Sequence, residues 1–281
     1  MKMADIEVQH ASNRVDKSKS TRQVKVGPVT IGSQQFAVIA GPCSIESESQ
    51  FRSSAESVKS LGAQLLRGGM WKMRTSAQSF QGLGEESFAF VKRVQTDLNM
   101  QLVSEVTDPR QIEQIDDLVA MYQVGSRNMY NYALLKELGQ TKKPVLLKRS
   151  FSALVDEWIK AAEYISQGGN ENIILCERGI RTFETATRNT LDLNAVAYVK
   201  RYTDFPVIVD PSHGVGVKDL IAPMSLAAIA AGADGLLIEV HPNPKEALSD
   251  GKQALAVNDF ELLMGQIKSL LPAFGKTLSW S

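Results

Sequence analysis

The sequence has no excess of charge of either sign, because 31 Lys and Arg residues are balanced by 31 Asp and Glu residues. Nucleic-acid-binding domains usually carry a basic excess, so the composition argues against that class, although cations can still cluster in a pocket. No apolar run approaches the ~20 residues of a membrane span, and the polar N-terminus lacks the apolar segment of a secretory signal. The only cysteines, Cys43 and Cys176, do not indicate a disulfide framework. We therefore expect a cytoplasmic protein with no nucleic-acid or membrane partner.

The length of 281 residues is sufficient for one large core, and α/β barrels of this size fold as single units. Eight apolar runs have the character of buried strands, at residues 36–40, 63–66, 101–106, 121–124, 144–147, 173–176, 206–209 and 235–240. Amphipathic stretches with a helical period follow them, at residues 48–61, 85–98, 109–118, 131–138, 153–166, 191–202, 219–231 and 258–271.

This alternation predicts a single (β/α)₈ TIM barrel of the α/β class. An open, doubly wound sheet is the alternative, but no strand is followed by the glycine fingerprint of a dinucleotide-binding fold. Residues 23–32 alternate around Gly27-Pro28 and predict a short N-terminal β-hairpin that caps the bottom of the barrel. Residues 1–21 are polar and aperiodic, so we predict a mobile N-terminal tail there and one barrel domain, including the hairpin, over residues 22–281.

Polar residues follow or end every predicted strand, at the end of a TIM barrel where active sites lie. They are Cys43, Arg67, Glu105, Arg127, Lys148-Arg149, Glu177-Arg178, Asp210 with His213, and Glu239 with His241. Structural surface charges would be scattered over both ends, so this pattern favours a functional site. Cys176 lies two residues before Arg178 on the same strand, and we predict that it packs in the core.

Cys43, His213, Glu239 and Asp250 form a candidate metal site. Three of them come from predicted strand ends, and Asp250 lies in the loop after the last strand. A thiolate, an imidazole and two carboxylates suit a divalent ion, for which we predict Mn²⁺, with Fe²⁺, Co²⁺ and Zn²⁺ as alternatives. Taken singly, Cys43 is better explained as a small buried apolar residue and His213 as a hydrogen-bonded histidine. The convergence of all four favours the metal.

A candidate anion site is formed by Arg67, Lys72, Arg127, Lys148 and Arg178. So many cations would repel one another unless a ligand with at least two negative charges neutralised them, although Glu105 and Glu177 could offset part of the charge. Farther along the loop, Arg74, Thr75 and Ser76 suggest a second, separate anionic group. Residues 79–84, Ser-Phe-Gln-Gly-Leu-Gly, predict a glycine-hinged loop that closes over the site, with an ordinary connection as the alternative.

Several motifs together carry a resemblance that covers residues 23–271. They are Ala40-Gly-Pro-Cys-Ser, Leu66-Arg-Gly-Gly, Lys72-x-Arg-Thr-Ser, Ser79-Phe-Gln-Gly-Leu-Gly, Ser126-Arg-Asn-Met, Leu146-Leu-Lys-Arg, Leu175-Cys-Glu-Arg-Gly-Ile-Arg-Thr, Val209-Asp-Pro-Ser-His and Glu239-Val-His-Pro. With these motifs the chain resembles the type Iβ 3-deoxy-D-arabino-heptulosonate-7-phosphate (DAHP) synthases, in the group that also includes the octulosonate-8-phosphate synthases. The Lys72-x-Arg-Thr-Ser motif favours the heptulosonate branch.

The resemblance implies a metal-dependent enzyme that condenses phosphoenolpyruvate (PEP) with erythrose 4-phosphate, the first step of the shikimate pathway towards the aromatic amino acids. It implies that Cys43, His213, Glu239 and Asp250 hold the metal, that Arg67, Lys72, Arg127, Lys148 and Arg178 bind PEP, and that Arg74, Thr75 and Ser76 bind the aldose phosphate. We add Glu105 as a substrate-binding residue and predict Lys72, Cys43 and His213 as the catalytic residues. Members commonly form tetramers, so a homo-oligomer, a tetramer or a dimer, is expected.

The sequence departs from the family pattern at two places. Met73 replaces a proline, with Ala77-Gln78 replacing Pro-Tyr, and Val217-Lys218 stands where two basic residues are usual. Both changes fall on the acceptor side, which leaves a different aldehyde as an alternative substrate. A non-catalytic barrel that binds a phosphorylated ligand or a partner protein is an alternative of another class. No regulatory domain is expected at either end, and hence weak or no inhibition by aromatic amino acids.

Overall fold

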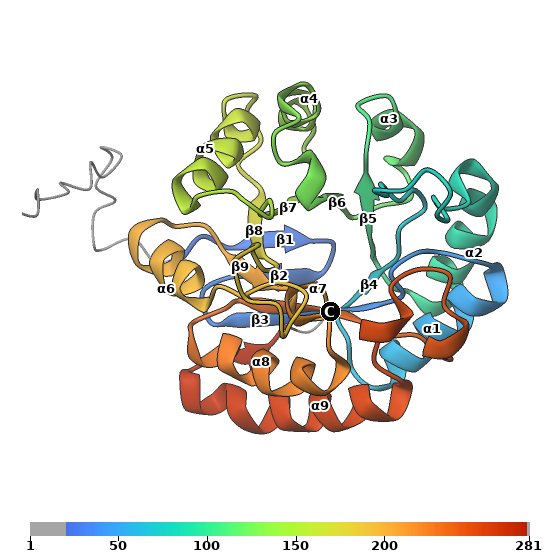
Figure 1. The fold of residues 1–281 in the computed structure, drawn as a ribbon. Helices are drawn as coiled ribbons and strands as arrows, with labels where there is room; N and C mark the ends of the chain where they lie inside the picture. Colours follow the sequence, from blue (N-terminus) through green and yellow to red (C-terminus); the bar gives the residue numbers. More distant parts are fainter. Residues whose placement is uncertain (1–20, 280–281) are drawn as a thin grey trace, which may run out of the picture.

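The computed structural model describes residues 21–279, which form a closed barrel of parallel strands (Figure 1). The strands are β3 (Gln35–Gly41), β4 (Leu65–Arg67), β5 (Leu102–Val106), β6 (Met121–Val124), β7 (Val145–Lys148), β8 (Ile173–Glu177), β9 (Val207–Val209) and β10 (Gly235–Glu239). Each pairs with the next, and β10 pairs with β3 to close the barrel, with Gly235 opposite Ala37. The predicted (β/α)₈ barrel is confirmed, and every predicted strand overlaps an observed one.

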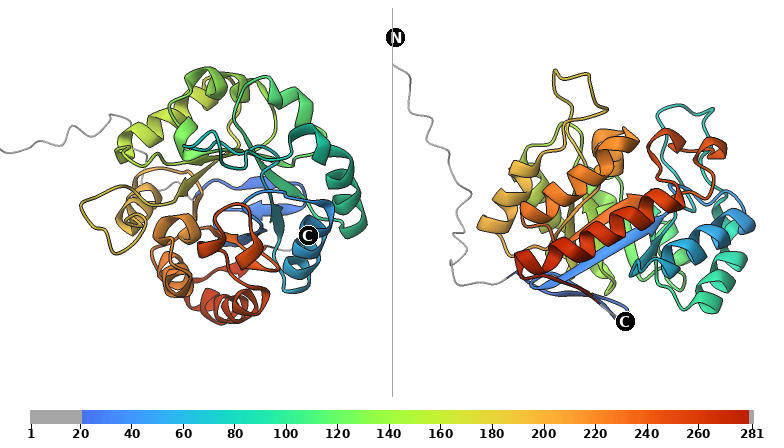
Figure 2. Two further views of the ribbon diagram at one scale, coloured as in Figure 1. Left: turned by 45° about the vertical axis from the view of Figure 1, so that its right-hand side comes forward. Right: turned by 90° about the horizontal axis from the view of Figure 1, so that it is seen from below.

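Helices surround the barrel and connect its strands (Figure 2). They are α1 (Glu48–Ser60), α2 (Phe88–Leu98), α3 (Gln111–Ile115), α4 (Tyr132–Gln140), α5 (Val155–Ser166), α6 (Leu193–Tyr202), α8 (Lys218–Ala230) and α9 (Val257–Leu270). The third is shorter than the predicted stretch 109–118. A further helix, α7 (Pro211–Val215), was not predicted, because five residues are too few to show an apolar period.

Apolar side chains alternate between the two faces of the barrel wall. In β3, Ala37 and Ile39 pack with the cluster inside the barrel, whereas Phe36 and Val38 pack with the cluster between strands and helices. Cys176 is fully buried in the inner cluster, which confirms its predicted place in the core. The inner cluster fills the barrel below the C-terminal ends of the strands. This packed core holds the strand ends, and the polar residues that follow them, in fixed positions.

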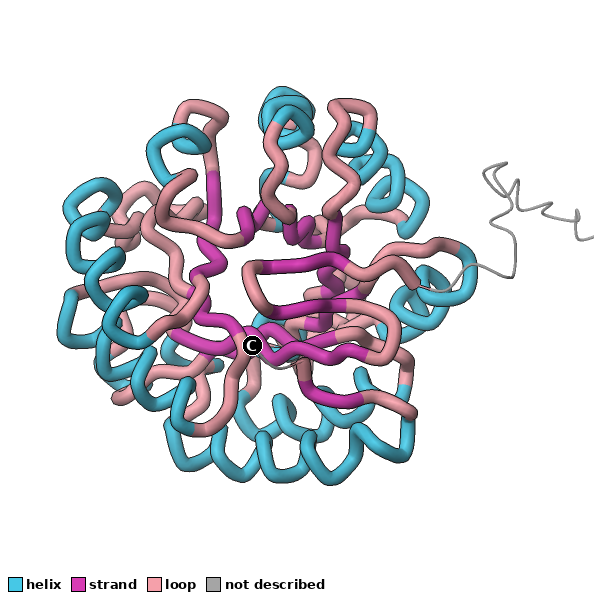
Figure 3. The backbone as a smooth tube through the Cα atoms, turned by 180° about the vertical axis from the view of Figure 1, so that it is seen from behind, coloured by secondary structure: helices cyan, strands magenta, loops and turns pink. Residues whose placement is uncertain are grey.

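The predicted hairpin consists of β1 (Val24–Val26) and β2 (Val29–Ile31) and lies across one end of the barrel (Figure 3). Its four apolar residues are buried against the inner cluster, so the hairpin caps the barrel as expected. A short strand, β11 (Thr277–Leu278), pairs with β3 at the same end. The long loops after β4, β8 and β10 extend from the opposite end (Figure 2).

The described part of the chain begins at Thr21, whose Oγ1 accepts a hydrogen bond from Lys200 Nζ at 2.6 Å. The rest of the predicted tail, residues 1–20, lies outside the described residues, as do residues 280 and 281. None of the helices within residues 21–279 has the length and apolar character needed to cross a membrane.

Candidate active site

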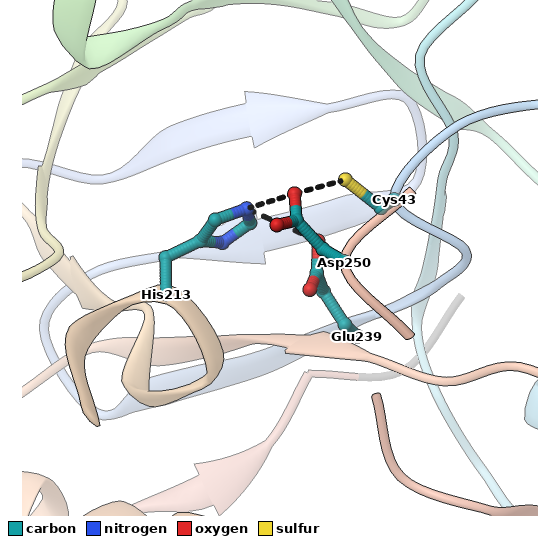
Figure 4. A group of neighbouring side chains, drawn as sticks. All are labelled: Cys43, His213, Glu239 and Asp250. Carbon is teal, nitrogen blue, oxygen red and sulfur yellow. Dashed lines mark hydrogen bonds and ion pairs between the residues drawn. The ribbon is translucent and has the colours of Figure 1, made fainter. Parts of the chain in front are cut away.

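Four side chains that could bind a metal ion meet at the C-terminal end of the strands (Figure 4). Cys43 follows β3, His213 lies in α7, Glu239 ends β10, and Asp250 lies in the loop after β10. One ligand atom from each lies within 4.8 Å of the ligand atoms of the other three. The structure therefore brings together the four residues that the sequence places in one candidate metal site.

Asp210 fixes the orientation of His213. One carboxylate oxygen accepts a hydrogen bond from the backbone nitrogen of His213 at 3.0 Å, and the other lies 2.6 Å from Nδ1 of the ring. Burial raises the pKa of Asp210, but the charge of Lys148 and the hydrogen bond with His213 outweigh that effect and hold the pKa well below its usual range. A carboxylate facing Nδ1 keeps the proton of a neutral imidazole there and leaves the lone pair on Nε2, as in many metal-binding histidines.

Glu239 is held in place from two sides. Its backbone nitrogen donates to Ser212 Oγ at 3.0 Å, and Gln253 Nε2 donates to Oε2 at 2.6 Å. The other oxygen, Oε1, is buried without a hydrogen-bond partner in the described part of the chain and lies 3.1 Å from His213 Nε2. With the ring neutral, two lone pairs face each other across this gap. A cation between them would satisfy both atoms, so the arrangement fits a bound metal ion.

Cys43 and Asp250 complete the group. Burial, with a contribution from Glu239, raises the pKa of Cys43 to about 12, so the metal-free protein carries a thiol. Its Sγ donates to Asp250 Oδ2 at 3.2 Å, and Asp250 Oδ1 accepts from Arg188 Nη1 at 3.2 Å. One sulfur, one imidazole nitrogen and two carboxylates form a donor set that suits Mn²⁺, Fe²⁺, Co²⁺ or Zn²⁺.

A cavity of about 210 Å³, the central cavity, adjoins His213 and Asp250. Most of the predicted substrate-binding residues line it, namely Lys72, Arg74, Thr75, Ser76, Glu105, Arg127, Lys148 and Arg178. Glu105 reaches the cavity beside Gly125, where a Cβ atom would lie 2.2 Å from Glu105 Oε1. A side chain at position 125 would therefore displace this carboxylate.

Arg67 is not among the lining residues of the central cavity. It is 2% exposed, and its Nη2 lies 3.4 Å from Glu239 Oε1. Its Nε and Nη1 are buried without a hydrogen-bond partner among residues 21–279. Buried guanidinium donors are costly to leave unsatisfied, so these two nitrogens suit an anionic group beside the candidate metal site.

The cations around the cavity differ in their partners. Lys148 Nζ donates to the buried Asp210 at 2.6 Å, so its charge is already neutralised. Arg127 donates to Thr75 Oγ1 at 3.0 Å, and Arg178 donates to the carbonyl of Gly179 at 3.5 Å. Within the described range, neither arginine forms an ion pair, and burial lowers the pKa of Arg178. A bound anion would relieve this unfavourable burial of charge.

The loop after β4 carries Arg74, Thr75 and Ser76 into the same cavity. At its base, the backbone nitrogen of Gly84 donates to Met70 O at 2.9 Å. Gly82 has a φ of +95°, and a Cβ atom there would lie 2.1 Å from Met70 O, so this turn requires glycine. The three residues to which the sequence assigns a separate anionic group therefore line the same cavity as Lys148 and Arg178.

The sequence reasoning missed several residues of the site, including Gln123 in the wall of the central cavity. Phe151 and Arg188 line the central cavity, Gln253 holds Glu239, and Ser249 contacts Cys43 Sγ at 3.2 Å. Phe151 lies three residues after the end of β7, and Ser249 and Gln253 lie within three residues of Asp250, so closeness to predicted site residues could have found these three. Arg188 lies in the long loop after β8, where no sequence signal marks it.

Residues 10–272 match the family model described as the DAHP synthetase I family. The chain belongs to this family. It is 45% identical over 252 residues to a phospho-2-dehydro-3-deoxyheptonate aldolase of Thermotoga maritima, covering 90% of this chain and 75% of that protein. It is 30% identical over 270 residues to a 2-dehydro-3-deoxyphosphooctonate aldolase of a Geobacter species, covering 89% of this chain and 97% of that protein.

Two solved structures from Thermotoga maritima share the fold. A DAHP synthase superposes with a TM-score of 0.89 at 43% identity, covering 92% of this chain and 76% of that one. A truncated form of 3-deoxy-D-arabino-heptulosonate 7-phosphate synthase gives a TM-score of 0.86 at 41% identity, covering 92% and 95%. The resemblance read from the motifs is therefore confirmed. The family is generally metal-dependent, in agreement with the four-residue cluster.

Proposed function

We propose that this enzyme condenses PEP with erythrose 4-phosphate and water to give DAHP and inorganic phosphate, the first step of the shikimate pathway. The observation that carries the proposal is the central cavity, where the four-residue candidate metal site adjoins Arg127 and Arg178, which form no ion pair within residues 21–279. The names of the relatives favour the heptulosonate product, because the heptonate aldolase is 45% identical and the octonate aldolase 30%.

In this proposal Cys43, His213, Glu239 and Asp250 hold one divalent ion. A divalent ion bound there supplies Lewis-acid polarisation of the acceptor aldehyde. The protein's own contribution is to keep the four donors close before the ion arrives. Asp210 orients the imidazole and Gln253 orients the carboxylate of Glu239, and such outer contacts set metal affinity.

Arg67, Arg127 and Arg178 bind the carboxylate and phosphate groups of PEP, together with Lys72 and Lys148. Their planar guanidinium groups suit both anions, since each can donate two parallel hydrogen bonds. Arg67 has two unsatisfied buried nitrogens, and the other two arginines lack ion pairs in residues 21–279. Neutralisation of these charges supplies binding free energy and fixes the position of PEP.

Arg74, Thr75 and Ser76 bind the phosphate of the aldose from the opposite part of the cavity. Holding the two substrates at separate anion subsites places C3 of PEP against the aldehyde carbon. Positioning of this kind lowers the barrier of a two-substrate reaction strongly. The loop of residues 79–84 closes over the cavity and excludes water that would compete for the site.

The new carbon–carbon bond forms between PEP C3 and the aldehyde carbon, which leaves positive charge at PEP C2. Water adds at C2 and loses one proton, which leaves a hydroxyl and the phosphate on C2. The C2–O bond to phosphate then breaks, and the hydroxyl gives its remaining proton to the departing phosphate, which leaves the ketone of the product. The former aldehyde oxygen needs a proton, which we assign to Lys72. Burial lowers the pKa of Lys72, but Cys43, Glu105 and Glu239 raise it by more than burial lowers it. The net pKa is raised, so the side chain is protonated and can donate. Because Cys43 is a thiol in the metal-free protein, we attribute that rise mainly to the glutamates.

The test measures phosphate release from PEP by the purified full-length chain with a divalent metal and a panel of aldoses. Turnover with erythrose 4-phosphate that a chelator abolishes and Mn²⁺ restores is the expected result. Arg178→Met should raise the KM for PEP far more than the KM for the aldose. Absence of phosphate release with every aldose would contradict the proposal.

A different aldehyde is the second candidate, because Met73 lines the cavity where family members carry a proline. The same panel decides this, since efficient turnover of erythrose 4-phosphate alone excludes it. For a non-catalytic barrel, Cys43→Ser would leave ligand binding unchanged, whereas the enzyme would lose turnover. The homo-oligomer and the cytoplasmic location stay predictions.

A further inference from the structure

Ser249 connects the residues assigned to the aldose phosphate with those assigned to the metal ion. Its side chain is buried, at 3% exposure, in the loop after β10. Arg74 Nη1 donates to Ser249 Oγ at 2.6 Å, and Ser249 Oγ donates to Cys43 Sγ at 3.2 Å. A guanidinium group can only donate, so the single hydroxyl proton is left for the sulfur. The result is a chain of two hydrogen bonds from Arg74, in the loop after β4 that binds the aldose phosphate in the proposed function, to the sulfur of Cys43.

The backbone around Ser249 is built for this contact. Glu46 Oε1 accepts a hydrogen bond from the backbone nitrogen of Leu248 at 2.9 Å, which ties this loop to the segment that carries Cys43. Asp250, the next residue, has a φ of +54°, an uncommon conformation for a residue other than glycine. With this left-handed backbone at Asp250, the side chains of the neighbouring residues Ser249 and Asp250 both contact the same sulfur. Strained backbone of this kind is often found at functional sites.

We propose that Ser249 is a positioning residue that reports the presence of the aldose phosphate to the sulfur of Cys43, an inference that rests on the proposed function. A hydrogen bond to a metal-binding sulfur lowers its electron donation to the metal. A cation bonded to the same hydroxyl polarises it and strengthens that bond. The hydroxyl is therefore a stronger donor while Arg74 contacts it than when it does not.

Binding of the aldose phosphate changes this chain at its outer end. A phosphate group competes effectively with a neutral hydroxyl for a guanidinium group, because charge-assisted hydrogen bonds are roughly twice as strong. Arg74 therefore turns from Ser249 to the phosphate, and the hydrogen bond from Ser249 to Cys43 weakens. Electron donation by the sulfur then depends on whether the second substrate is present.

Absorption spectroscopy with Co²⁺ alone as the metal tests this inference without turnover. A thiolate bound to Co²⁺ gives a charge-transfer band in the near ultraviolet, whose wavelength increases when the sulfur loses a hydrogen-bond donor. Ser249→Ala should shift the band to longer wavelength. Erythrose 4-phosphate, added without PEP, should shift the wild-type band further in the same direction than it shifts the band of Ser249→Ala, in which only the direct effect of the aldehyde on the ion remains.

Two further variants make the result decisive. Arg74→Met keeps the hydroxyl but removes its cation, and should move the band of the protein without erythrose 4-phosphate to a wavelength between those of wild type and Ser249→Ala. Ser225→Ala, in which a buried hydroxyl bonded to Ile221 O in α8 is removed, should behave as wild type. A Ser249→Ala band with the wild-type position and response would overturn the inference while leaving the metal site intact. A band that persists in Cys43→Ser, or is missing from wild type, would instead refute the proposed metal site and this inference with it.

Discussion

The ammonium group of Lys148 lies 2.6 Å from Oδ2 of Asp210, and both side chains are buried. The same carboxylate oxygen lies 2.6 Å from Nδ1 of His213. One oxygen atom thus joins the wall of the central cavity to a candidate metal ligand. Because the two contacts share an acceptor, a change at Asp210 affects the metal cluster and the cavity together.

Asp210→Asn should weaken metal binding about 10–100-fold, the usual effect of losing an outer contact to a ligand. An amide has no negative charge to hold the proton on Nδ1, so the imidazole loses its fixed orientation. Competition with a chelator of known affinity measures the change. The matched control is Asp259→Asn, which removes an exposed ion pair with Lys218 and should leave metal affinity unchanged. Equal affinities in the two variants would show that Asp210 does not orient the ligand.

Metal uptake should release a proton from Cys43. Burial raises the pKa of this thiol to about 12, so the metal-free protein is protonated there at pH 7, whereas a sulfur ligand binds as thiolate. Metal affinity should therefore increase with pH below that pKa, by about tenfold per unit for one released proton. Calorimetric titration in two buffers with different ionisation enthalpies counts the protons. Cys43→Ser should release about one proton fewer, and an unchanged count would assign the proton to another group.

The sequence predicted the barrel well because buried parallel strands are continuous apolar runs, and all eight stood out. It did not predict α7, although Asp210 followed by Pro211 is a common start of a helix and could have indicated it. This matters for the site, because the capping contact of Asp210 to the backbone nitrogen of His213 is part of what fixes the imidazole.

Partners within the site could not be predicted from the sequence. Lys148 follows a strand end like the other cations, and only the packed structure shows that Asp210 neutralises it. Arg188 and Ser249 reach the metal cluster through loops whose paths depend on long-range packing. Sequence patterns indicate which end of a barrel is functional, whereas the pairing of charges depends on distances between strands that are far apart in the chain.

Phe151 should strengthen PEP binding, although it is apolar. Its ring centre lies 5.2 Å from the guanidinium carbon of Arg127, 4.6 Å from that of Arg178 and 5.0 Å from that of Arg181. Such contacts contribute about 0.5–1 kcal/mol each where exposed and more where buried. The ring face therefore offsets part of the repulsion among these cations and holds two of them at the cavity.

Phe151→Leu should raise the KM for PEP several-fold with a smaller change in kcat, because the leucine keeps the apolar volume but has no ring. Phe151→Tyr retains the aromatic face and should stay close to wild type. Steady-state kinetics with PEP varied at saturating aldose separates the two parameters. If the leucine and tyrosine variants had the same KM, the ring face would have no role in binding.

The opposite end of the barrel should determine stability without affecting catalysis. Asp234, fully buried before β10, accepts hydrogen bonds from Lys200 Nζ at 2.6 Å, from Lys276 Nζ at 2.9 Å and from the backbone nitrogen of Val207 at 2.9 Å. It thereby ties α6 and the segment before β11 to the barrel wall. Removing one partner of a buried ion pair leaves the other charge uncompensated.

Asp234→Ala should lower the free energy of unfolding by about 3–5 kcal/mol, the range for a broken buried ion pair. Urea unfolding followed by circular dichroism measures the loss, and the KM for PEP of the folded variant should stay at the wild-type value. Asp204→Ala, which breaks the partly exposed pair with Arg22, is the matched control and should cost at most about 1 kcal/mol. A loss of unfolding free energy for Asp234→Ala no larger than that of the control would contradict this prediction. It would mean that water hydrates the two lysines at little cost, and that the apolar hairpin holds this end of the barrel instead.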